Sequence, residues 1–241
     1  MRTIPLYRQD SRHPQAQACA ACRERGMALF GVLDESALDD IHVHIADVEL
    51  PTGSVLFDIG ERGHALYTVR TGMVRLERVT ARGDRRVVRL AGRGDLIGQE
   101  ALLQRSHLDA AVACTPVRAC RIPRTLLDDL SDRHPELMRG LMTRWQEAVE
   151  SSEQWLAELA TGPARRRVLH LLLELARHAD DGVLWMPRRA EMGAMLDLTI
   201  ETTSRIVSSL RREGVISDVD AQHARLDGVR LQAALREQDQ G

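Results

Sequence analysis

Between Val48 and Pro123 the sequence consists of short alternating segments separated by glycine turns. This pattern constrains the possible fold of the chain more than any other feature of the sequence. The segments are rich in valine and leucine, and glycines such as Gly53, Gly60 and Gly72 stand between them. Short strands at this regular spacing are typical of an antiparallel barrel or jelly roll. The pattern therefore predicts a β-roll whose strands include Ser54–Phe57, Ala65–Val69, Met73–Val79 and Arg86–Leu90.

A long amphipathic helix is predicted between His134 and Ala160. Its apolar or small residues recur in steps of three and four, which is the spacing of a heptad seam. Such a seam pairs with a second copy of itself or packs on its own β-roll. A helix that joins two domains has little surface of its own chain to cover, so we expect a homodimer. The seam residues are Met142, Trp145, Val149, Ser152, Leu156 and Leu159.

Gly162 and Pro163 end this helix and mark the predicted hinge, because proline is favourable at the start of a following helix. An amphipathic helix is then expected over Arg165–His178, and a shorter one over Glu35–Ile45. The predicted organisation is a cysteine-bearing segment (1–28), a β-roll domain (29–131), a dimerisation helix (132–161) and a C-terminal domain (162–241).

Two short helices separated by a brief turn are predicted in the C-terminal domain. The first covers Arg189–Leu196, and the second begins after Thr199, which is a good N-cap residue. Glu201 in the first turn of the second helix suits the helix dipole. The apolar face of this helix is expected to consist of Ile206, Val207 and Leu210, with Glu201, Thr202, Ser204 and Arg205 on the open side.

A helix with small polar groups and an arginine near its N-terminus is what a reader of the DNA major groove requires. Arg205 can donate two hydrogen bonds to guanine, and Glu201 can accept one from the cytosine amino group. Ser204 and Thr202 can reach a base edge or a phosphate, and Arg211 and Arg212 can contact phosphates. From spacing alone, an exposed amphipathic helix with ordinary surface charges remains the alternative.

The composition gives no independent sign of nucleic-acid binding. The formal net charge is -2, and the chain contains no lysine, so local arginines must supply any affinity for phosphate. A hydrophobic content of 44% with 28% charged residues argues against disorder. No apolar run is long enough for a membrane span, and the polar start lacks a secretory signal, so a cytoplasmic protein is expected.

The segment Leu198–Arg205, followed by Leu210–Ile216, closely resembles the recognition helix of the CRP/FNR family of transcription regulators. Gly94–Gly98 and the segment from Cys120 to Leu130 look like the effector domain of that family. The resemblance implies an α+β protein with an N-terminal cyclic-nucleotide-binding-type β-roll, a dimerisation helix and a C-terminal winged helix-turn-helix. It also implies wing strands near Val215–Asp218 and Arg225–Val229.

Glu201, Ser204 and Arg205 match the FNR branch of this family. The resemblance implies a half-site similar to TTGAT, read by a dimer as an inverted repeat in double-stranded DNA with half-sites about one helical turn apart. RNA polymerase would be a further partner if the protein activates transcription.

The effector domain lacks the family's pattern for cyclic nucleotide. Members that bind this ligand carry an arginine-serine pair near its phosphate, within the segment that corresponds to His107–Ala111. Here Asp109 brings a negative charge to that place, and Arg105-Ser106 precedes it. Control by a cyclic nucleotide is therefore not expected.

The cysteines resemble the oxygen-sensing FNR branch instead. Cys19 and Cys22 correspond to part of its N-terminal cluster motif, and Cys120 falls where the distant cluster cysteine lies. Thiolates of this kind hold a [4Fe–4S] cluster. The pattern has one more N-terminal cysteine, near Ala28, which has no ligand atom. Cys114, which is more often a buried small hydrophobe, is a candidate fourth ligand, as are Asp34, Glu24 or a histidine.

Other readings of the sensor stay open at this point. Oxidation of Cys19, Cys22 or Cys120 would make a thiol switch, His42 and His44 would suit a heme, and a nitric-oxide sensor or relict cysteines are further alternatives. A cysteine-dependent enzyme is the alternative of another class. Catalytic and nucleotide-binding motifs are missing, and Cys120 is expected at a strand end with no obvious base, so no enzyme is predicted.

Overall fold

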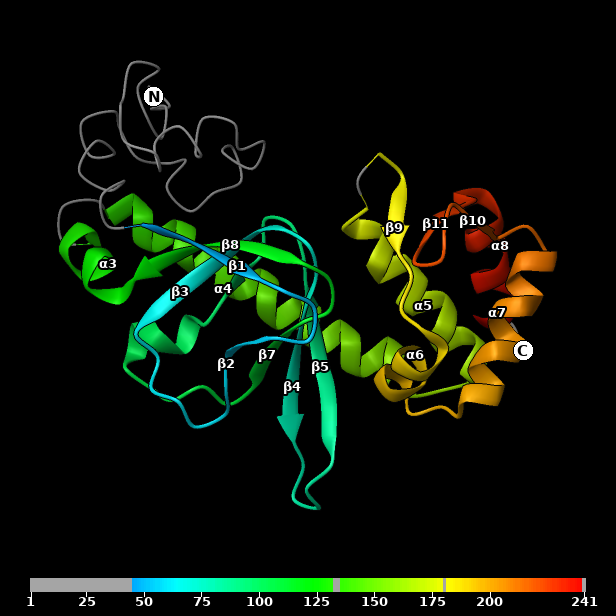
Figure 1. Cartoon of the computed structure of the whole chain (residues 1–241), viewed down its shortest axis with the longest axis horizontal. Coiled ribbons are helices and arrows are strands. Elements are labelled where there is room, and N and C mark those ends of the chain that lie inside the picture. The colour runs from blue at the N-terminus through cyan, green and yellow to red at the C-terminus, as the bar shows by residue number, and fades with distance from the viewer. Residues whose placement is uncertain (1–44, 132–134, 180, 240–241) are drawn as a thin grey trace. The chain divides into compact units, whose positions relative to one another are not determined.

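The computed structural model describes residues 45–131, 135–179 and 181–239, which form two compact units with a boundary between Ser151 and Ser152 (Figure 1). The predicted helix over Glu35–Ile45 lies outside the described residues, apart from Ile45, which is buried. The first unit contains strands β1 (Ala46–Leu50), β2 (Val55–Phe57), β3 (Ala65–Thr71), β4 (Val74–Val79), β5 (Arg85–Ala91), β6 (Leu96–Ile97), β7 (Ala110–Ala113) and β8 (Val117–Pro123), the short helix η3 (Gln99–Leu103), helix α3 (Arg124–Ser131) and all but the last three residues of helix α4 (Pro135–Gln154).

Within the described residues of this unit, the strands form two antiparallel four-stranded sheets in the orders β1-β8-β3-β6 and β2-β7-β4-β5. Their facing side chains share one apolar core, to which Val69 and Val117 contribute from one sheet and Val74 and Ala111 from the other. The β-roll predicted from the alternating segments is confirmed, and each of the four quoted runs coincides with a strand.

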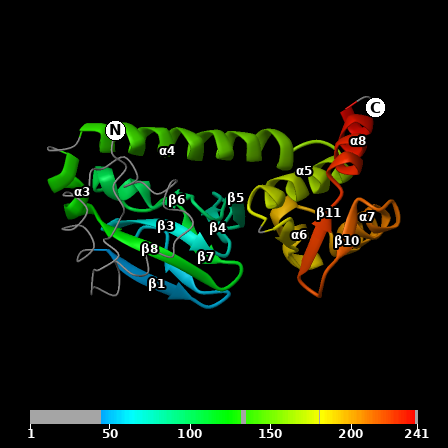
Figure 2. The same ribbon diagram turned by 90° about the horizontal axis from the view of Figure 1, so that it is seen from above.

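A second apolar cluster attaches the helices to the β-roll. Leu66 and Ile122 of the sheet pack with Leu127 of α3 and with Leu137 and Leu141 of α4. These leucines are buried because α4 turns one side toward the sheet, and Figure 2 shows the helix running along the strands of the first unit. One side of α4 is therefore occupied by its own chain.

The second unit is a three-stranded sheet with a group of helices. It contains the π-helical turn η4 (Trp155–Leu159), helices α5 (Ala164–Arg177), α6 (Arg189–Leu196), α7 (Ile200–Arg212) and α8 (Gly228–Asp239), and strands β9 (Val183–Trp185), β10 (Ile216–Asp218) and β11 (His223–Leu226). The described strands pair antiparallel in the order β10-β11-β9. Helix α5 buries Val168, Leu171, Leu172 and Leu175, the four residues that its periodicity placed inward.

The second wing strand was predicted too long. It ends at Leu226, so Val229, expected on that strand, lies in α8. The side chain of Asp227 accepts a hydrogen bond from the backbone N–H of Arg230 (3.0 Å), and its carbonyl accepts one from Leu231 (2.9 Å). Asp227 therefore caps the N-terminus of α8. The capping residue is visible in the sequence, but the β-branched Val229 favoured the prediction of a strand.

Ionisation of the Glu174 carboxyl in α5 contributes to the stability of the second unit. Burial opposes ionisation of this carboxyl, but contacts with His178 and Arg177 outweigh that effect and lower its pKa. Ionised Glu174 therefore stabilises the fold above the unfolded pKa of about 4.3, and this contribution is lost as the pH falls through the lower folded pKa. Glu174→Gln is expected to flatten the acid limb of the pH dependence, as measured by urea unfolding at neutral pH and at about pH 3.

Candidate nucleic-acid interface

The turn between α6 and α7 depends on Gly193 and Asp197. Asp197 ends α6 in the left-handed region (φ 55°), and the backbone N–H of Leu198 donates to the carbonyl of Gly193 (2.8 Å). A Cβ atom on Gly193 would lie 2.6 Å from the carbonyl oxygen of Leu198. The absence of a side chain at Gly193 therefore lets the backbone of Leu198 approach the end of α6 closely.

Thr199 caps α7, as its sequence position predicted. Its Oγ1 accepts a hydrogen bond from the backbone N–H of Thr202 (3.2 Å) and donates one to the hydroxyl of Thr202 (3.0 Å). Thr203 is fully buried, and its hydroxyl donates to the carbonyl of Thr199 (2.9 Å). The predicted apolar face did not include Thr203 and did include Ile206, which is only half-buried. The internal hydroxyl bond explains how a threonine takes a core position.

Thr199→Ala is expected to destabilise the second unit by about 1 kcal/mol, because it leaves a backbone donor at the start of α7 without its cap. The loss is measured by urea unfolding followed by circular dichroism. Thr199→Ser, which keeps the hydroxyl, is the matched control and should retain most of the stability. Equal losses in the two variants would contradict a capping role.

The exposed face of α7 carries the side chains predicted to meet bases. Steps of four, three and four residues place Glu201, Arg205, Ser208 and Arg212 on one side, and all four are exposed or half-buried, with Ser204 half-buried beside them. Thr203, Val207 and Leu210 are buried on the opposite side. The helix thus presents an acceptor, a hydroxyl and two guanidinium groups to the same region.

Two arginines of α5 bind the C-terminal ends of α6 and α7. Nη1 of Arg167 in α5 donates to the carbonyl of Leu196 at the end of α6 (2.5 Å). At the end of α7, Glu213 pairs with Arg165, and its carboxylate accepts from the hydroxyl of Ser209 (2.7 Å). These two partners lower the pKa of Glu213. Sequence reasoning missed these arginines, since each meets a partner far away in the chain.

Arg211 was predicted to contact a DNA phosphate, and the structure pairs it within the chain. Its guanidinium binds the carboxylate of Asp218 on β10, with 2.7 Å between Nη2 and Oδ1. Arg212 extends along the exposed face, where its Nε lies 3.4 Å from the carbonyl of Ser208.

The segment that corresponds to the nucleotide-binding part of the effector domain is held by its own charges. Asp109 accepts two hydrogen bonds from Arg78 (2.7 and 3.1 Å). His107 is buried, stacks on Phe57 with 3.8 Å between ring centroids, and lies 3.3 Å from Glu100. Burial opposes ionisation of Glu100, but His107 and its other contacts lower its pKa. Both carboxylates of this segment are thus engaged by side chains of the same unit.

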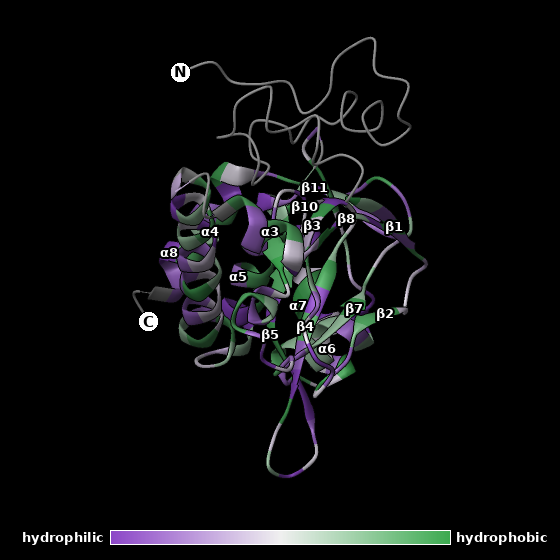
Figure 3. Ribbon diagram, turned by 90° about the vertical axis from the view of Figure 1, so that its left-hand side faces the viewer, coloured by the Kyte–Doolittle hydropathy of each residue, from purple (hydrophilic) through white to green (hydrophobic). Residues whose placement is uncertain are grey.

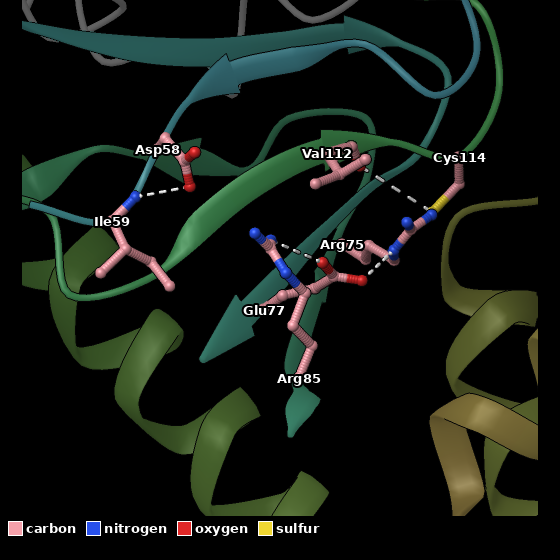
Figure 4. Close-up of polar contacts among 7 residues, drawn as sticks. All are labelled: Asp58, Ile59, Arg75, Glu77, Arg85, Val112 and Cys114. Carbon is pink, nitrogen blue, oxygen red and sulfur yellow. Dashed lines mark hydrogen bonds and ion pairs between the residues drawn. The ribbon is translucent and has the colours of Figure 1, made fainter. Parts of the chain in front are cut away.

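Of the two described cysteines, Cys120 lies in a strand and Cys114 directly follows one. Cys120 was expected at a strand end, and it instead lies inside β8, opposite Asp47 of β1 and Thr68 of β3. Its Sγ is 4.0 Å from the carboxylate of Asp47. Cys114 is buried at the end of β7, where its Sγ lies 3.8 Å from Nη1 of Arg75 (Figure 4).

Arg75 in turn binds Glu77, which also binds Arg85, so Cys114 adjoins a charged group on the β4–β5 hairpin (Figure 4). Among the residues that the structure describes, no three or more His, Cys, Asp or Glu side chains gather as they would around a metal ion. Cys19 and Cys22, together with Ala28 and the candidate ligands Asp34, Glu24, His42 and His44, lie outside the described residues.

Most of the predicted seam forms an exposed stripe that follows α4 and ends at Leu156, the second residue of η4. Met142 and Leu156 are 67% and 66% exposed, Trp145 and Val149 are each 40% exposed, and Ser152 is half-buried. Figure 3 shows hydrophobic and hydrophilic residues following one another along α4. Leu159 differs, because it is buried in η4, which packs against α5. The stripe therefore ends at Leu156, and exposed Met138 continues its spacing toward the start of α4.

Comparison with known proteins assigns both units. Residues 47–134 match the cyclic nucleotide-binding domain family, and residues 166–234 match the Crp-like helix-turn-helix domain family. The fumarate and nitrate reduction regulatory protein of Vibrio cholerae is 27% identical over 208 residues, which cover 83% of this chain and 82% of that protein. The anaerobic regulatory protein of Haemophilus influenzae is 27% identical over 230 residues, covering 90% of this chain and 89% of the relative.

Solved structures give the same assignment. FixK2 from Bradyrhizobium japonicum superposes with a TM-score of 0.71 at 25% identity, covering 79% of this chain and 96% of that one. A CRP/FNR family transcriptional regulator from Thermus thermophilus superposes with a TM-score of 0.60 at 27% identity, covering 80% and 100% of the two chains. Over the residues that can be described, no helix has both the length and the apolar character needed to cross a membrane. The chain belongs to the CRP/FNR family, whose members are DNA-binding transcription regulators and not enzymes.

Proposed function

We propose that this regulator reads a TTGAT-like inverted repeat through Glu201, Ser204 and Arg205. The observation that carries the proposal is the exposed face of α7, where these side chains stand together while the opposite face is buried. Arg205 would donate to O6 and N7 of guanine, and Glu201 would accept from the amino group of cytosine. Arg212 would bind a phosphate, which fixes position without reading sequence.

We further propose that the DNA-binding form is a homodimer joined along α4. An inverted repeat requires two recognition helices related by a two-fold axis. The exposed stripe that includes Met142, Trp145, Val149 and Leu156 follows a heptad spacing, which is the pattern that buries apolar side chains between paired helices. The other side of α4 is already covered by its own β-roll through Leu137 and Leu141.

A gel-shift titration tests the DNA assignment. The full chain is mixed with a duplex that carries the TTGAT–ATCAA palindrome, and with a duplex of the same length and composition in scrambled order. The expected result is a shift of the palindrome at a lower protein concentration, under aerobic or anaerobic conditions. Equal affinity for the two duplexes under both conditions would contradict the proposed site.

The signal proposed is oxygen or redox state, sensed through Cys19, Cys22 and Cys120. Relatives named anaerobic regulatory protein and fumarate and nitrate reduction regulatory protein support this assignment. Of the two described cysteines, Cys120 fits a ligand role better than Cys114, because Cys120 is half-buried and Cys114 is buried, so that a cluster can reach only Cys120. A bound [4Fe–4S] cluster would supply an oxygen-labile centre, and the chain would contribute thiolates from its N-terminal segment and from β8.

Anaerobic purification tests the sensor. Visible absorption together with iron and sulfide analysis is expected to show a cluster, and Cys120→Ala should abolish it while Cys114→Ala should not. A colourless anaerobic protein without iron would contradict both the cluster and a heme.

A thiol switch is the second candidate, and the alanine at position 28 favours it because the ligand set is incomplete there. In that case the iron-free protein would change its DNA affinity on treatment with a thiol oxidant, and Cys120→Ser would remove the response. Unchanged affinity after oxidation would contradict the switch.

A further inference from the structure

An ion pair joins the end of the proposed recognition helix to the wing. Arg211 stands in the last turn of α7, and Asp218 is the last residue of β10. Nε and Nη2 of Arg211 lie 3.1 and 2.7 Å from the same carboxylate oxygen of Asp218. The side chains are 40% and 45% exposed, so the pair lies at the surface of the DNA-binding unit.

A second arginine adjoins this pair. Arg189 begins α6, and its pKa is lowered first by burial and then by the positive charge of Arg211, while the negative charge of Asp218 opposes the shift. One carboxylate therefore compensates two guanidinium groups that come from different helices. Without the negative charge of Asp218, the two guanidinium groups would repel each other, and binding of another anion between them would become favourable.

Arg211 lies close to the face of α7 that is proposed to contact DNA. Arg211 follows Ser204 by seven residues, which is close to two helical turns, so both lie on the same side of α7. That side adjoins the exposed face with Glu201 and Arg205. An exposed ion pair contributes little to stability, and its larger consequence is the direction in which it holds the guanidinium.

We propose that Asp218 is a positioning residue that determines specificity, because it holds Arg211 away from the DNA phosphates. The inference rests on the proposed reading of DNA by α7 and adds a role for the wing. Each arginine that binds a phosphate adds affinity that depends on salt and not on sequence. A guanidinium already bound to a carboxylate adds less, so the pair lowers the sequence-independent share of the affinity.

The test is Asp218→Asn in the full chain, with affinity measured across salt concentrations on the palindrome and on the scrambled duplex. The substitution keeps the shape of the side chain and removes its charge. The slope of log affinity against log salt is expected to steepen by about 0.9 for each released arginine that binds a phosphate. The ratio of specific to non-specific affinity should fall. In Asp218→Asn combined with Arg211→Gln, the slope should return to the wild-type value.

Asp220→Asn is the matched control, since it removes one negative charge from the same wing turn without touching Arg211. Asp220 binds His223 (2.9 Å) and the backbone N–H of Gln222 (2.8 Å). A slope that steepens equally in the two single variants, or that is unchanged in Asp218→Asn, would overturn the proposal. If wild type does not prefer the palindrome, the proposed site fails, while the slopes on the scrambled duplex still decide the role of Asp218.

Discussion

Arg205→Ala is expected to weaken binding to the palindrome by about 1–3 kcal/mol for each half-site, the range for a bidentate arginine–guanine contact. The exposed guanidinium lies one helical turn after Glu201, on the side of α7 opposite its buried residues. Its removal should also abolish the preference for guanine. Fluorescence anisotropy with the palindrome, and with a duplex in which adenine replaces the guanine of each half-site, measures both effects.

Arg212→Ala separates base reading from general attraction to DNA. Arg212 lies on the same face seven residues later, where a phosphate is the expected partner. Its loss should weaken binding to both duplexes alike and reduce the salt slope by about 1 per phosphate contact. If Arg205→Ala kept the preference for guanine, another side chain would have to read that base.

The helix-turn-helix was predictable from sequence because local chemistry sets its boundaries. The observed bounds of α6 are the predicted ones, and α7 starts directly after Thr199. An N-cap hydroxyl and a short turn act within a few residues, so they can be recognised without the rest of the fold. The β-roll was predictable for a similar reason, since alternation and glycine turns are visible along a single strand and its neighbours.

The partners of the arginines were not predictable in the same way. Arg165 meets Glu213 across 48 residues, and Arg211 meets Asp218 only because β10 folds back beside α7. From sequence alone, Arg211 was expected to contact a DNA phosphate, and Arg165 was expected only at the start of an amphipathic helix. The paired arrangement became visible only with the wing strand in place.

Short elements and buried polar groups were the other features that could not be predicted from the sequence. Strand β9 spans only Val183–Trp185, and a segment of this length shows no clear period. Thr203 is fully buried although its residue type suggests exposure, because its hydroxyl bonds within the first turn of α7. The burial of Leu159 depends on the π-helical turn after α4, which a regular heptad does not contain.

Trp145→Glu is expected to convert the protein into a monomer that no longer binds the palindrome. The indole is 40% exposed at the middle of the stripe on α4, with Met142 and Val149 on either side. In a paired helix, a glutamate at this position would bury a charge beside its own copy, and desolvation and repulsion of such charges cost several kcal/mol. Sedimentation velocity measures the association state, and anisotropy measures the loss of DNA binding.

Thr143→Glu is the matched control, because it places the same charge two residues away on an exposed position outside the stripe. It should leave the dimer and its DNA affinity nearly unchanged, which would show that the position of the charge and not its presence dissociates the chains. A Trp145→Glu protein that still sediments as a dimer would place the interface elsewhere. Because two half-sites must be occupied together, a monomer that folds normally should still lose nearly all preference for the inverted repeat.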